Sequence, residues 1–479
     1  MQDVDVPALE PERFGEVMDP GTLTSFQQAM ARTRDLLEGR RVWHINSTEK
    51  GGGVAEMLKP LLGYQRGAGW DAGWLVIDGD DEFFGVTKRI HNHLHADAAD
   101  GERLGQEERR AYERTLEREV QEVGKRIDER DVVFLQDPQT LGLAPVLKRA
   151  GVTVIWTCHV GIDTPNDVAR RAWDFLRGYL GDVDAYVFTR SSYVWEGLDE
   201  RRVKVIAPAI DPFSPKNQSL GGDATRDILR AGGILDDGPA NDPRFERGDG
   251  SEGRITERAD VEQDRSLPSS GPVVLQVSRW DKLKDHAGVL RGFAEHVPSD
   301  LDAHLVLAGP QADGVSDDPE MSEVLADLLE ARDALETSVR ERTHVARLPM
   351  DDLEASDAIV NGLQRRADVI VQKSLAEGFG LTVSEGMWKG RPVVASGVGG
   401  IKDQIVPEQT GLLIDDPSAL DKFGEAVTRL LEDADTRERL GRQAHERVRE
   451  HFLLTRYLVQ TADLLQDLSA DGDRVSERT

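Results

Sequence analysis

Short apolar runs alternate with longer amphipathic segments along most of the chain. The short runs are rich in β-branched residues, as expected for buried strands of a parallel sheet. The predicted strands cover 41–46, 131–136, 152–158, 185–189, 203–208, 272–278, 303–309, 368–371 and 391–395. The predicted helices cover 22–38, 102–130, 167–180, 319–338, 356–367, 417–434, 435–450 and 451–468. This alternation predicts an α/β fold built from doubly wound parallel sheets.

The length of the chain bears on its domain organisation. A chain of 479 residues is too long for one ordinary core, so we expect two domains of roughly 200 residues each. The first should cover 1–210 and the second 271–450, with a last helix and tail at 451–479. Gly, Asp, Glu, Arg and Ser dominate 211–270, which predicts a partly disordered linker. Deleting most of 215–270 should then leave the fold and the chemistry largely intact.

The formal net charge of −29 excludes whole classes of partner. The protein's own field would repel nucleic acid and anionic membranes, and an acidic substrate would need a local basic patch. The surplus of Asp and Glu, with fewer lysines than arginines, is typical of a surface adapted to high salt, as in a halophilic protein. The chain has an acidic N-terminus and no run of about 18 apolar residues, which predicts a cytoplasmic location.

The single cysteine and a group of histidines bear on metal binding. Cys158 cannot form an internal disulfide, and its apolar neighbours predict a packed strand residue. His91, His93 and His95 alternate, so on a strand they would share a face that could hold a metal. No acidic or cysteine ligand accompanies them at a recognised spacing. We therefore expect an exposed loop there and assign no metal.

The stretch 372–390 is the clearest candidate for a binding site. Gly378 and Gly380 allow the backbone to approach a ligand, and a helix beginning near Leu381 leaves N–H groups without intrahelical partners. These groups predict a site for a phosphate or for sugar oxygens.

Two glutamates belong to the same stretch. Glu377 lies in the loop and Glu385 about one turn into the helix, so both carboxylates could reach one ligand. Taken without their neighbours, they would be a helix-start charge and a solvated helix residue.

Polar residues follow other predicted strands, where open α/β sheets bind their ligands. Asp137 ends one strand and could also be a turn residue or helix cap. His159 ends the next and could also be a structural histidine. Arg279 and Lys284 follow a third strand and could clamp a diphosphate, although such residues are usually surface charges.

A glycine-rich turn follows the first predicted strand. The segment 47–58 contains Gly51, Gly52 and Gly53 at the start of a helix. A triple glycine also marks flexible turns and dinucleotide loops, but the spacing of the dinucleotide fingerprint is absent.

The motif E-G-F-G-L-T-V-S-E-G-M-W-K-G-R-P-V-V-A, followed by G-V-G-G-I-K-D-Q-I-V, resembles the donor site of retaining glycosyltransferases of family four. More narrowly, the chain resembles the trehalose glycosyltransferring synthases. The motifs S-T-x-x-G-G-G-V-A-E, D-P-Q, C-H and S-R-x-D-x-x-K fit the same family, over about 40–210 and 271–468. The resemblance implies the fold called GT-B, in which two Rossmann-like domains face a cleft and a terminal helix packs back on the first domain.

The resemblance also implies roles for individual residues. Arg279 and Lys284 would bind the leaving diphosphate, together with the backbone amides of Leu381 and Thr382. Glu377 would bind the transferred glucose, and Glu385 the ribose of the donor. His159 would contact the donor glucose, and Asp137 would hold the acceptor. The pattern carries over only in part to Asp163, because two additional residues precede it. The remaining donor-site positions that match are Gly51, Gly52, Gly53, Gly378, Phe379 and Gly380.

The expected reaction moves glucose from a nucleoside diphosphate glucose to glucose, and it forms or cleaves trehalose with retention. No cofactor is implied as a requirement, and Mg²⁺ would at most stimulate. The expected partners are the nucleotide sugar and glucose or trehalose, and a homodimer is compatible with the sequence. The alternatives are a retaining trehalose phosphorylase, a family-four enzyme with another acceptor, a nucleotide-sugar epimerase, and a dehydrogenase.

Overall fold

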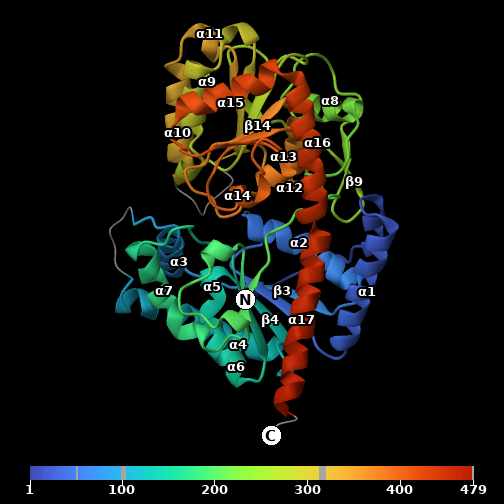
Figure 1. Ribbon diagram of the computed structural model, residues 1–479, viewed down its shortest axis with the longest axis vertical. Coiled ribbons are helices and arrows are strands. Elements are labelled where there is room, and N and C mark those ends of the chain that lie inside the picture. Colours follow the sequence, from blue (N-terminus) through green and yellow to red (C-terminus); the bar gives the residue numbers. More distant parts are fainter. Residues whose placement is uncertain (50–51, 99–103, 312–319, 477–479) are drawn as a thin grey trace. The chain divides into compact units, whose positions relative to one another are not determined.

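The chain folds into two compact units. The computed structural model describes residues 1–49, 52–98, 104–311 and 320–476 (Figure 1). Unit 1 comprises Met1–Ala209 and the residues from Leu454 onward, whereas unit 2 comprises Ile210–Leu453.

Unit 1 is built on a seven-stranded sheet in the order β1-β3-β2-β4-β5-β6-β7. All neighbours are parallel except β1, which pairs antiparallel with β3 at one edge. The strands are β1 (Gln2–Val4), β2 (Val42–Asn46), β3 (Ala72–Val76), β4 (Val132–Gln136), β5 (Thr153–Cys158), β6 (Ala185–Phe188) and β7 (Val203–Val205). The helices are α1 (Pro20–Leu36), α2 (Gly53–Gly67), α3 (Asp81–Leu94), α4 (Gln106–Arg126), α5 (Asp137–Thr140), α6 (Ala144–Arg149), α7 (Asp167–Leu180) and α17 (Leu454–Ser476).

Unit 2 repeats this plan with a sheet in the order β10-β13-β12-β11-β14-β15-β16, in which only β10 is antiparallel to its neighbour. Its strands are β10 (Asp260–Glu262), β11 (Val273–Val277), β12 (His304–Pro310), β13 (Thr343–Leu348), β14 (Val369–Gln372), β15 (Val393–Ser396) and β16 (Leu412–Ile414). Its helices are α8 (Gly222–Ala231), α9 (His286–His296), α10 (Glu320–Asp333), α11 (Thr337–Arg340), α12 (Leu353–Arg366), α13 (Leu381–Trp388), α14 (Ile401–Gln404), α15 (Leu420–Glu432) and α16 (Ala434–His451).

Each sheet is buried between its helices, and this explains the continuous apolar runs in the sequence. The strands β2 and β4 of unit 1, and β14 and β15 of unit 2, are buried at every position. Cys158 is buried at the end of β5, so its prediction as a packed strand residue is confirmed.

The last helix belongs to the first unit, as the resemblance implied. Helix α17 packs against α1, and the Gln466 side chain donates a 2.9 Å hydrogen bond to Thr33 Oγ1. At its N-terminal end, the Arg456 guanidinium donates to the carbonyls of Ala207 and Pro208.

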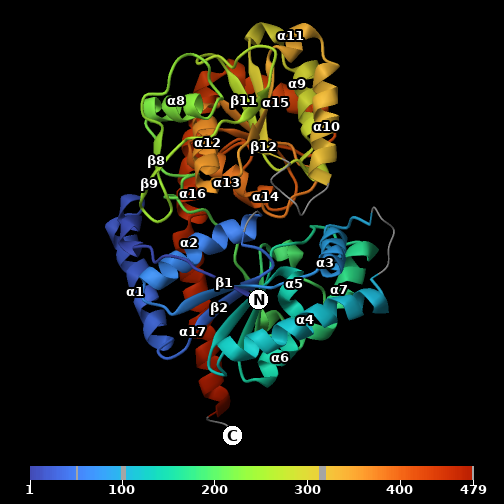
Figure 2. The ribbon, with the colours of Figure 1, turned by 180° about the vertical axis from the view of Figure 1, so that it is seen from behind.

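The prediction of a partly disordered linker at 211–270 is wrong. This segment is part of unit 2 and contains α8, a hairpin of β8 (Arg244–Glu246) and β9 (Glu252–Arg254), and the edge strand β10. Helix α8 packs on α12 (Figure 2), and the side chains of its Ile228 and Leu229 are fully buried. The segment folds with few apolar residues, because its charged side chains also form ion pairs with the rest of unit 2. Arg247 pairs with Asp352 and Glu354, for example.

The prediction of an exposed loop at His91, His93 and His95 is also wrong. His91 and His93 lie in α3, and His95 follows its last residue. The helix begins where the Asp80 side chain accepts a hydrogen bond from the N–H of Phe83. His93 faces the core and is fully buried.

Among the residues that the structure describes, no helix combines the length and the apolar character needed to cross a membrane.

Candidate active site

The glycine-containing loop 373–380 connects β14 to α13. Gly380 caps the helix with φ of +83°, a left-handed conformation that favours glycine, and α13 begins at Leu381 as the sequence predicted. The first N–H groups of such a helix have no intrahelical acceptor, and this end of α13 therefore suits an anion.

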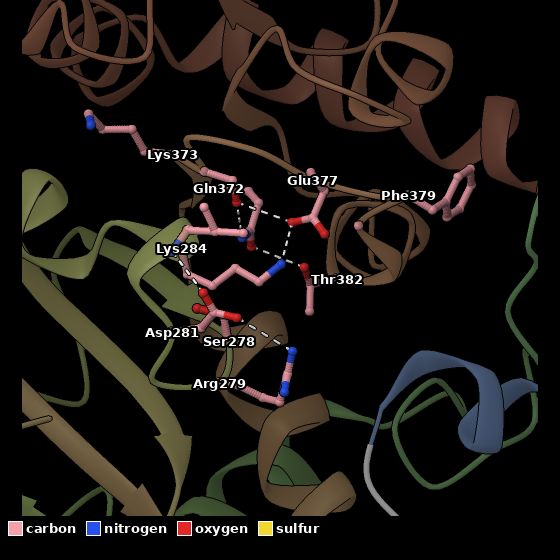
Figure 3. A network of polar contacts seen from close by, with 12 residues as sticks. Ser278, Arg279, Asp281, Lys284, Gln372, Lys373, Glu377, Phe379 and Thr382 are labelled. Atoms are coloured by element: carbon pink, nitrogen blue, oxygen red, sulfur yellow. Dashed lines mark hydrogen bonds and ion pairs between the residues drawn. The ribbon is translucent and has the colours of Figure 1, made fainter. Parts of the chain in front are cut away.

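A network of polar contacts surrounds this loop (Figure 3). Lys284 Nζ donates a 2.6 Å hydrogen bond to Glu377 Oε2, which also accepts a 3.1 Å bond from Ser374 Oγ. Gln372 connects Ser374 to Thr382, because its amide nitrogen donates to Ser374 Oγ and its amide oxygen accepts from Thr382 Oγ1. The structure thus brings together Lys284, Glu377 and Thr382, residues that were predicted from separate parts of the chain.

Arg279, the second predicted cation, follows β11 in the same region of unit 2 (Figure 3). Its guanidinium lies 3.5 Å from Asp281 Oδ2, and half of its side chain is exposed. Lys284 is more enclosed, with 17% of its side chain exposed. A forked cation and a point cation therefore follow the same strand, as expected for a diphosphate clamp.

Glu385 lies in α13 and is almost completely buried. Gln364 Nε2 donates a 3.3 Å hydrogen bond to its Oε2 atom, and Lys216 Nζ lies 3.9 Å from its Oε1 atom. Lys216 also pairs with Asp357 at 3.2 Å. Lys216 comes from the segment that was expected to be a disordered linker, so the sequence analysis missed it.

Unit 1 carries the predicted pair of Asp137 and His159. The backbone N–H of His159 donates a 2.7 Å hydrogen bond to Asp137 Oδ1. The imidazole lies between Thr189 Oγ1, 3.2 Å from Nδ1, and Gln136 Oε1, 3.3 Å from Nε2. Burial raises the pKa of the Asp137 carboxyl, which the neighbouring His159 partly opposes, and burial lowers the pKa of the His159 imidazole.

Asp137 has φ of +58°, which is uncommon for a residue other than glycine. Such strain persists where the surrounding structure enforces it, often at functional sites. Asp163, which matches the family only in part, pairs with Arg190 and accepts a hydrogen bond from Ser192.

Of the triple glycine, Gly52 and Gly53 are described and Gly51 lies outside the described residues. Gly52 precedes the first residue of α2 with φ of +83°, and Gly53 is that first residue. The glycine turn therefore leads into the N-terminal end of a helix, where the first N–H groups have no acceptor within the helix.

Comparison with known proteins identifies the family. A model described as trehalose synthase, N-terminal domain, matches residues 44–195, and one described as glycosyl transferases group 1 matches residues 257–447. The trehalose synthase of Rubrobacter xylanophilus is 36% identical over 434 residues, covering 88% of this chain and 89% of that protein. The chain belongs to the trehalose synthase family.

More distant relatives bear on the alternatives. The trehalose phosphorylase of Pleurotus pulmonarius is 25% identical over 465 residues, covering 92% of this chain but 58% of that protein. A solved α,α-trehalose-phosphate synthase (UDP-forming) from Burkholderia vietnamiensis matches with a TM-score of 0.64 and 14% identity, covering 89% of this chain and 98% of that one. The likeness of this and other solved structures confirms the expected GT-B fold class, and the family places the chain among the glycosyltransferases.

Proposed function

We propose that this chain transfers glucose from a nucleoside diphosphate glucose to glucose, forming or reversibly cleaving α,α-trehalose. The observation that carries the proposal is the contact of Lys284 with Glu377 beside the N-terminal end of α13. One cation, one carboxylate and a row of N–H groups suit a substrate that has both phosphate oxygens and sugar hydroxyls. The 36% identity to a trehalose synthase supports trehalose as the disaccharide.

In the proposed reaction, the bond between the donor's anomeric carbon and the diphosphate breaks, and a bond to the acceptor's anomeric oxygen forms. Negative charge grows on the leaving diphosphate. Arg279, Lys284 and the amides of Leu381 and Thr382 stabilise that charge. The leaving phosphate takes the acceptor's proton on the same face, so the configuration is retained and no carboxylate has to act as a nucleophile.

The other residues bind the substrates. Glu377 holds hydroxyls of the transferred glucose, and Glu385 holds the ribose. His159 and Asp137 of unit 1 contact the donor glucose and the acceptor, respectively. These steps require no metal, because the cationic side chains supply the positive charge, and Mg²⁺ would at most stimulate them.

Product analysis tests the proposal directly. The purified protein is incubated with UDP-, ADP- and GDP-glucose, each with glucose and with other sugars. We expect trehalose and a nucleoside diphosphate from at least one donor, also in the presence of EDTA. Cleavage of trehalose that requires inorganic phosphate and no nucleotide would instead establish a phosphorylase. Release of an epimerised nucleotide sugar without an acceptor would establish an epimerase.

We also propose that the enzyme works at high salt, because its net charge of −29 favours screening by counterions. A midpoint of thermal unfolding that does not rise between about 0.1 and 2 M KCl would contradict this.

A further inference from the structure

Three consecutive carbonyls of the glycine loop accept hydrogen bonds from one short segment, Gly400–Gln404, which we call the strap. The backbone N–H of Gly400 donates a 3.0 Å hydrogen bond to Gly378 O. The Gln404 side chain donates through Nε2 to Phe379 O at 2.6 Å and to Gly380 O at 3.2 Å. The strap therefore fixes the direction of each peptide group from Gly378 to Leu381.

The orientation of the Gln404 amide is determined by its partners. Backbone carbonyls only accept hydrogen bonds, so the Nε2 group must face Phe379 and Gly380. Its Oε1 atom accepts a 2.5 Å hydrogen bond from Ser384 Oγ in α13. Gln404 is fully buried, and it joins the loop to the first turns of the helix that follows.

A second element holds the strap in place. Arg447 of α16 donates 2.6 Å hydrogen bonds to the carbonyls of Asp403 and Gln404. The strap also packs closely against the loop, since a Cβ atom on Gly400 would lie 2.6 Å from Phe379 Cα. The strap and the loop are thus in direct backbone contact.

The held carbonyls determine where the loop's N–H groups point. In a trans peptide the C=O of one residue and the N–H of the next point in opposite directions. With the carbonyls of Gly378, Phe379 and Gly380 directed at the strap, the N–H groups of Phe379, Gly380 and Leu381 point away from it. Successive N–H groups aimed to one side form a binding surface for an anion.

We propose that Gln404 is a positioning residue for the amides that bind the leaving diphosphate, an inference that rests on the function proposed above. It does not touch the substrate. It holds two carbonyls so that the N–H groups on the opposite side meet the phosphate oxygens in the transition state. Pre-aligned donors of this kind contribute to turnover because they need no reorganisation during the reaction.

The test compares substitutions of Gln404 with a substitution elsewhere in unit 2. Gln404→Met keeps the length of the side chain and removes its hydrogen bonds. Gln404→Glu keeps the shape and the acceptor for Ser384, but it replaces the two N–H donors with a carboxyl that has at most one O–H to donate to the carbonyls. Gln443→Met is the matched control, because Gln443 is exposed on α16. Thermal unfolding gives the fraction of each variant that is folded at the assay temperature.

We expect kcat per folded enzyme to fall at least about tenfold in both Gln404 variants, while KM for the donor changes less than about threefold. Gln443→Met should behave like the unmodified chain. A purely structural role would lower the unfolding midpoint and leave kcat per folded enzyme unchanged, and that result would overturn the proposal. If neither variant folds, Ser384→Ala carries the test, because it removes the hydrogen bond that Gln404 Oε1 accepts and so holds the amide less firmly. Its kcat should fall about two- to fivefold, and an unchanged kcat would overturn the proposal.

A second measurement does not depend on glucosyl transfer. Amide hydrogen exchange is carried out on the intact protein, with and without inorganic pyrophosphate, and is read from the proteolytic fragment that contains residues 378–382. Pyrophosphate should slow the exchange in the unmodified chain and in Gln443→Met, but much less in Gln404→Met. Equal protection in all three would overturn the role of Gln404. If the protection behaves as expected but no donor yields trehalose, the proposed function fails and the positioning role stands.

Discussion

Lys284 Nζ lies 2.6 Å from Glu377 Oε2, so the residue predicted to bind the diphosphate and the residue predicted to bind the sugar are in direct contact. Both side chains are largely enclosed, with exposures of 17% and 9%. Each charge therefore has a partner in the absence of substrate. If the two residues bind the donor as proposed, donor binding exchanges this contact for contacts with phosphate oxygens and sugar hydroxyls, and substitutions at the two positions should have coupled effects.

The first prediction concerns this pair. If Lys284 stabilises the leaving diphosphate as proposed, Lys284→Met should lower kcat by about 10²- to 10³-fold, because it removes that charge. Glu377→Gln should also lower kcat. The double variant should lose less than the product of the two single losses, since Lys284→Met alone also leaves an enclosed carboxylate without this cation. Steady-state kinetics with the donor found by product analysis measure all three variants. Strictly multiplicative losses would show that the contact has no functional consequence.

Arg279 provides the second prediction. Arg279→Lys keeps the charge but loses the planar fork, so kcat should fall more than donor affinity weakens. Lys282→Arg is a suitable control, because Lys282 is 59% exposed and pairs with Glu320 and Glu323 on the surface. Normal turnover of Arg279→Lys and Arg279→Ala at saturating donor would show that Arg279 is a surface charge.

The third prediction separates the ribose from the phosphates. If Glu385 binds ribose, Glu385→Gln should weaken binding of a nucleoside diphosphate by about 1.5–3 kcal/mol and leave pyrophosphate binding nearly unchanged. Lys216→Met should also weaken binding of a nucleoside diphosphate, because Lys216 Nζ lies 3.9 Å from Glu385 Oε1. Lys422→Met is the control, since Lys422 pairs with Glu425 on the exposed face of α15. Calorimetric titrations with UDP, ADP, GDP and pyrophosphate measure the effect. Equal losses for pyrophosphate and for the nucleotides would contradict the assignment.

The segment 211–270 gives a prediction opposite to the one made from its composition. Asn361 is fully buried, and its Nδ2 atom donates to Pro215 O at 3.0 Å and to Gln218 O at 2.9 Å. Asn361→Ala should therefore destabilise the protein by about 1–3 kcal/mol, because buried carbonyls lose their donor. Deleting 222–268 should abolish soluble protein, since it removes α8 and the edge strand β10. Urea unfolding and soluble yield measure these effects, and an active deletion variant would restore the linker interpretation.

Patterns within short stretches predicted much of the fold. The β-branched run before Gln372 and the glycines at 378 and 380 were enough to predict a strand, a loop and a helix beginning at Leu381. The histidines of α3 were wrongly assigned to an exposed loop, because their alternation was considered only as a possible metal site on a strand. The opposing signal was Asp80 as a helix cap, followed by Phe83, Val86, Ile90 and Leu94 at helical spacing.

Contacts between distant residues could not be predicted in this way. Lys216 and Glu385 are far apart in the sequence, and nothing near Lys216 indicates an acidic partner in α13. Gln404 was part of a recognised motif, but its hydrogen bonds to Phe379 and Gly380 depend on the return of the chain after β15. The composition of 211–270 was misleading because Asp264, which pairs with Arg332 and Arg340, contributes to folding through ion pairs that a count of apolar residues ignores.

The last prediction concerns acid stability. Burial lowers the pKa of His44 to about 3, that of His286 to about 4 and that of His344 to about 3. In the unfolded chain a histidine titrates near about 6.5. Between these values the unfolded state binds more protons than the folded state. The stability that these histidines contribute is therefore fully present above about pH 6.5 and is lost as the pH falls below it. Each such histidine should lower the free energy of unfolding by about 2 kcal/mol when the pH falls from 7 to 5.

His344→Gln tests this, and it should reduce the difference in the free energy of unfolding in urea between these two pH values by about that amount. His451→Gln, at a half-exposed position, should leave the difference unchanged. An equal acid sensitivity of His344→Gln and the unmodified chain would show that His344 is protonated in the folded state.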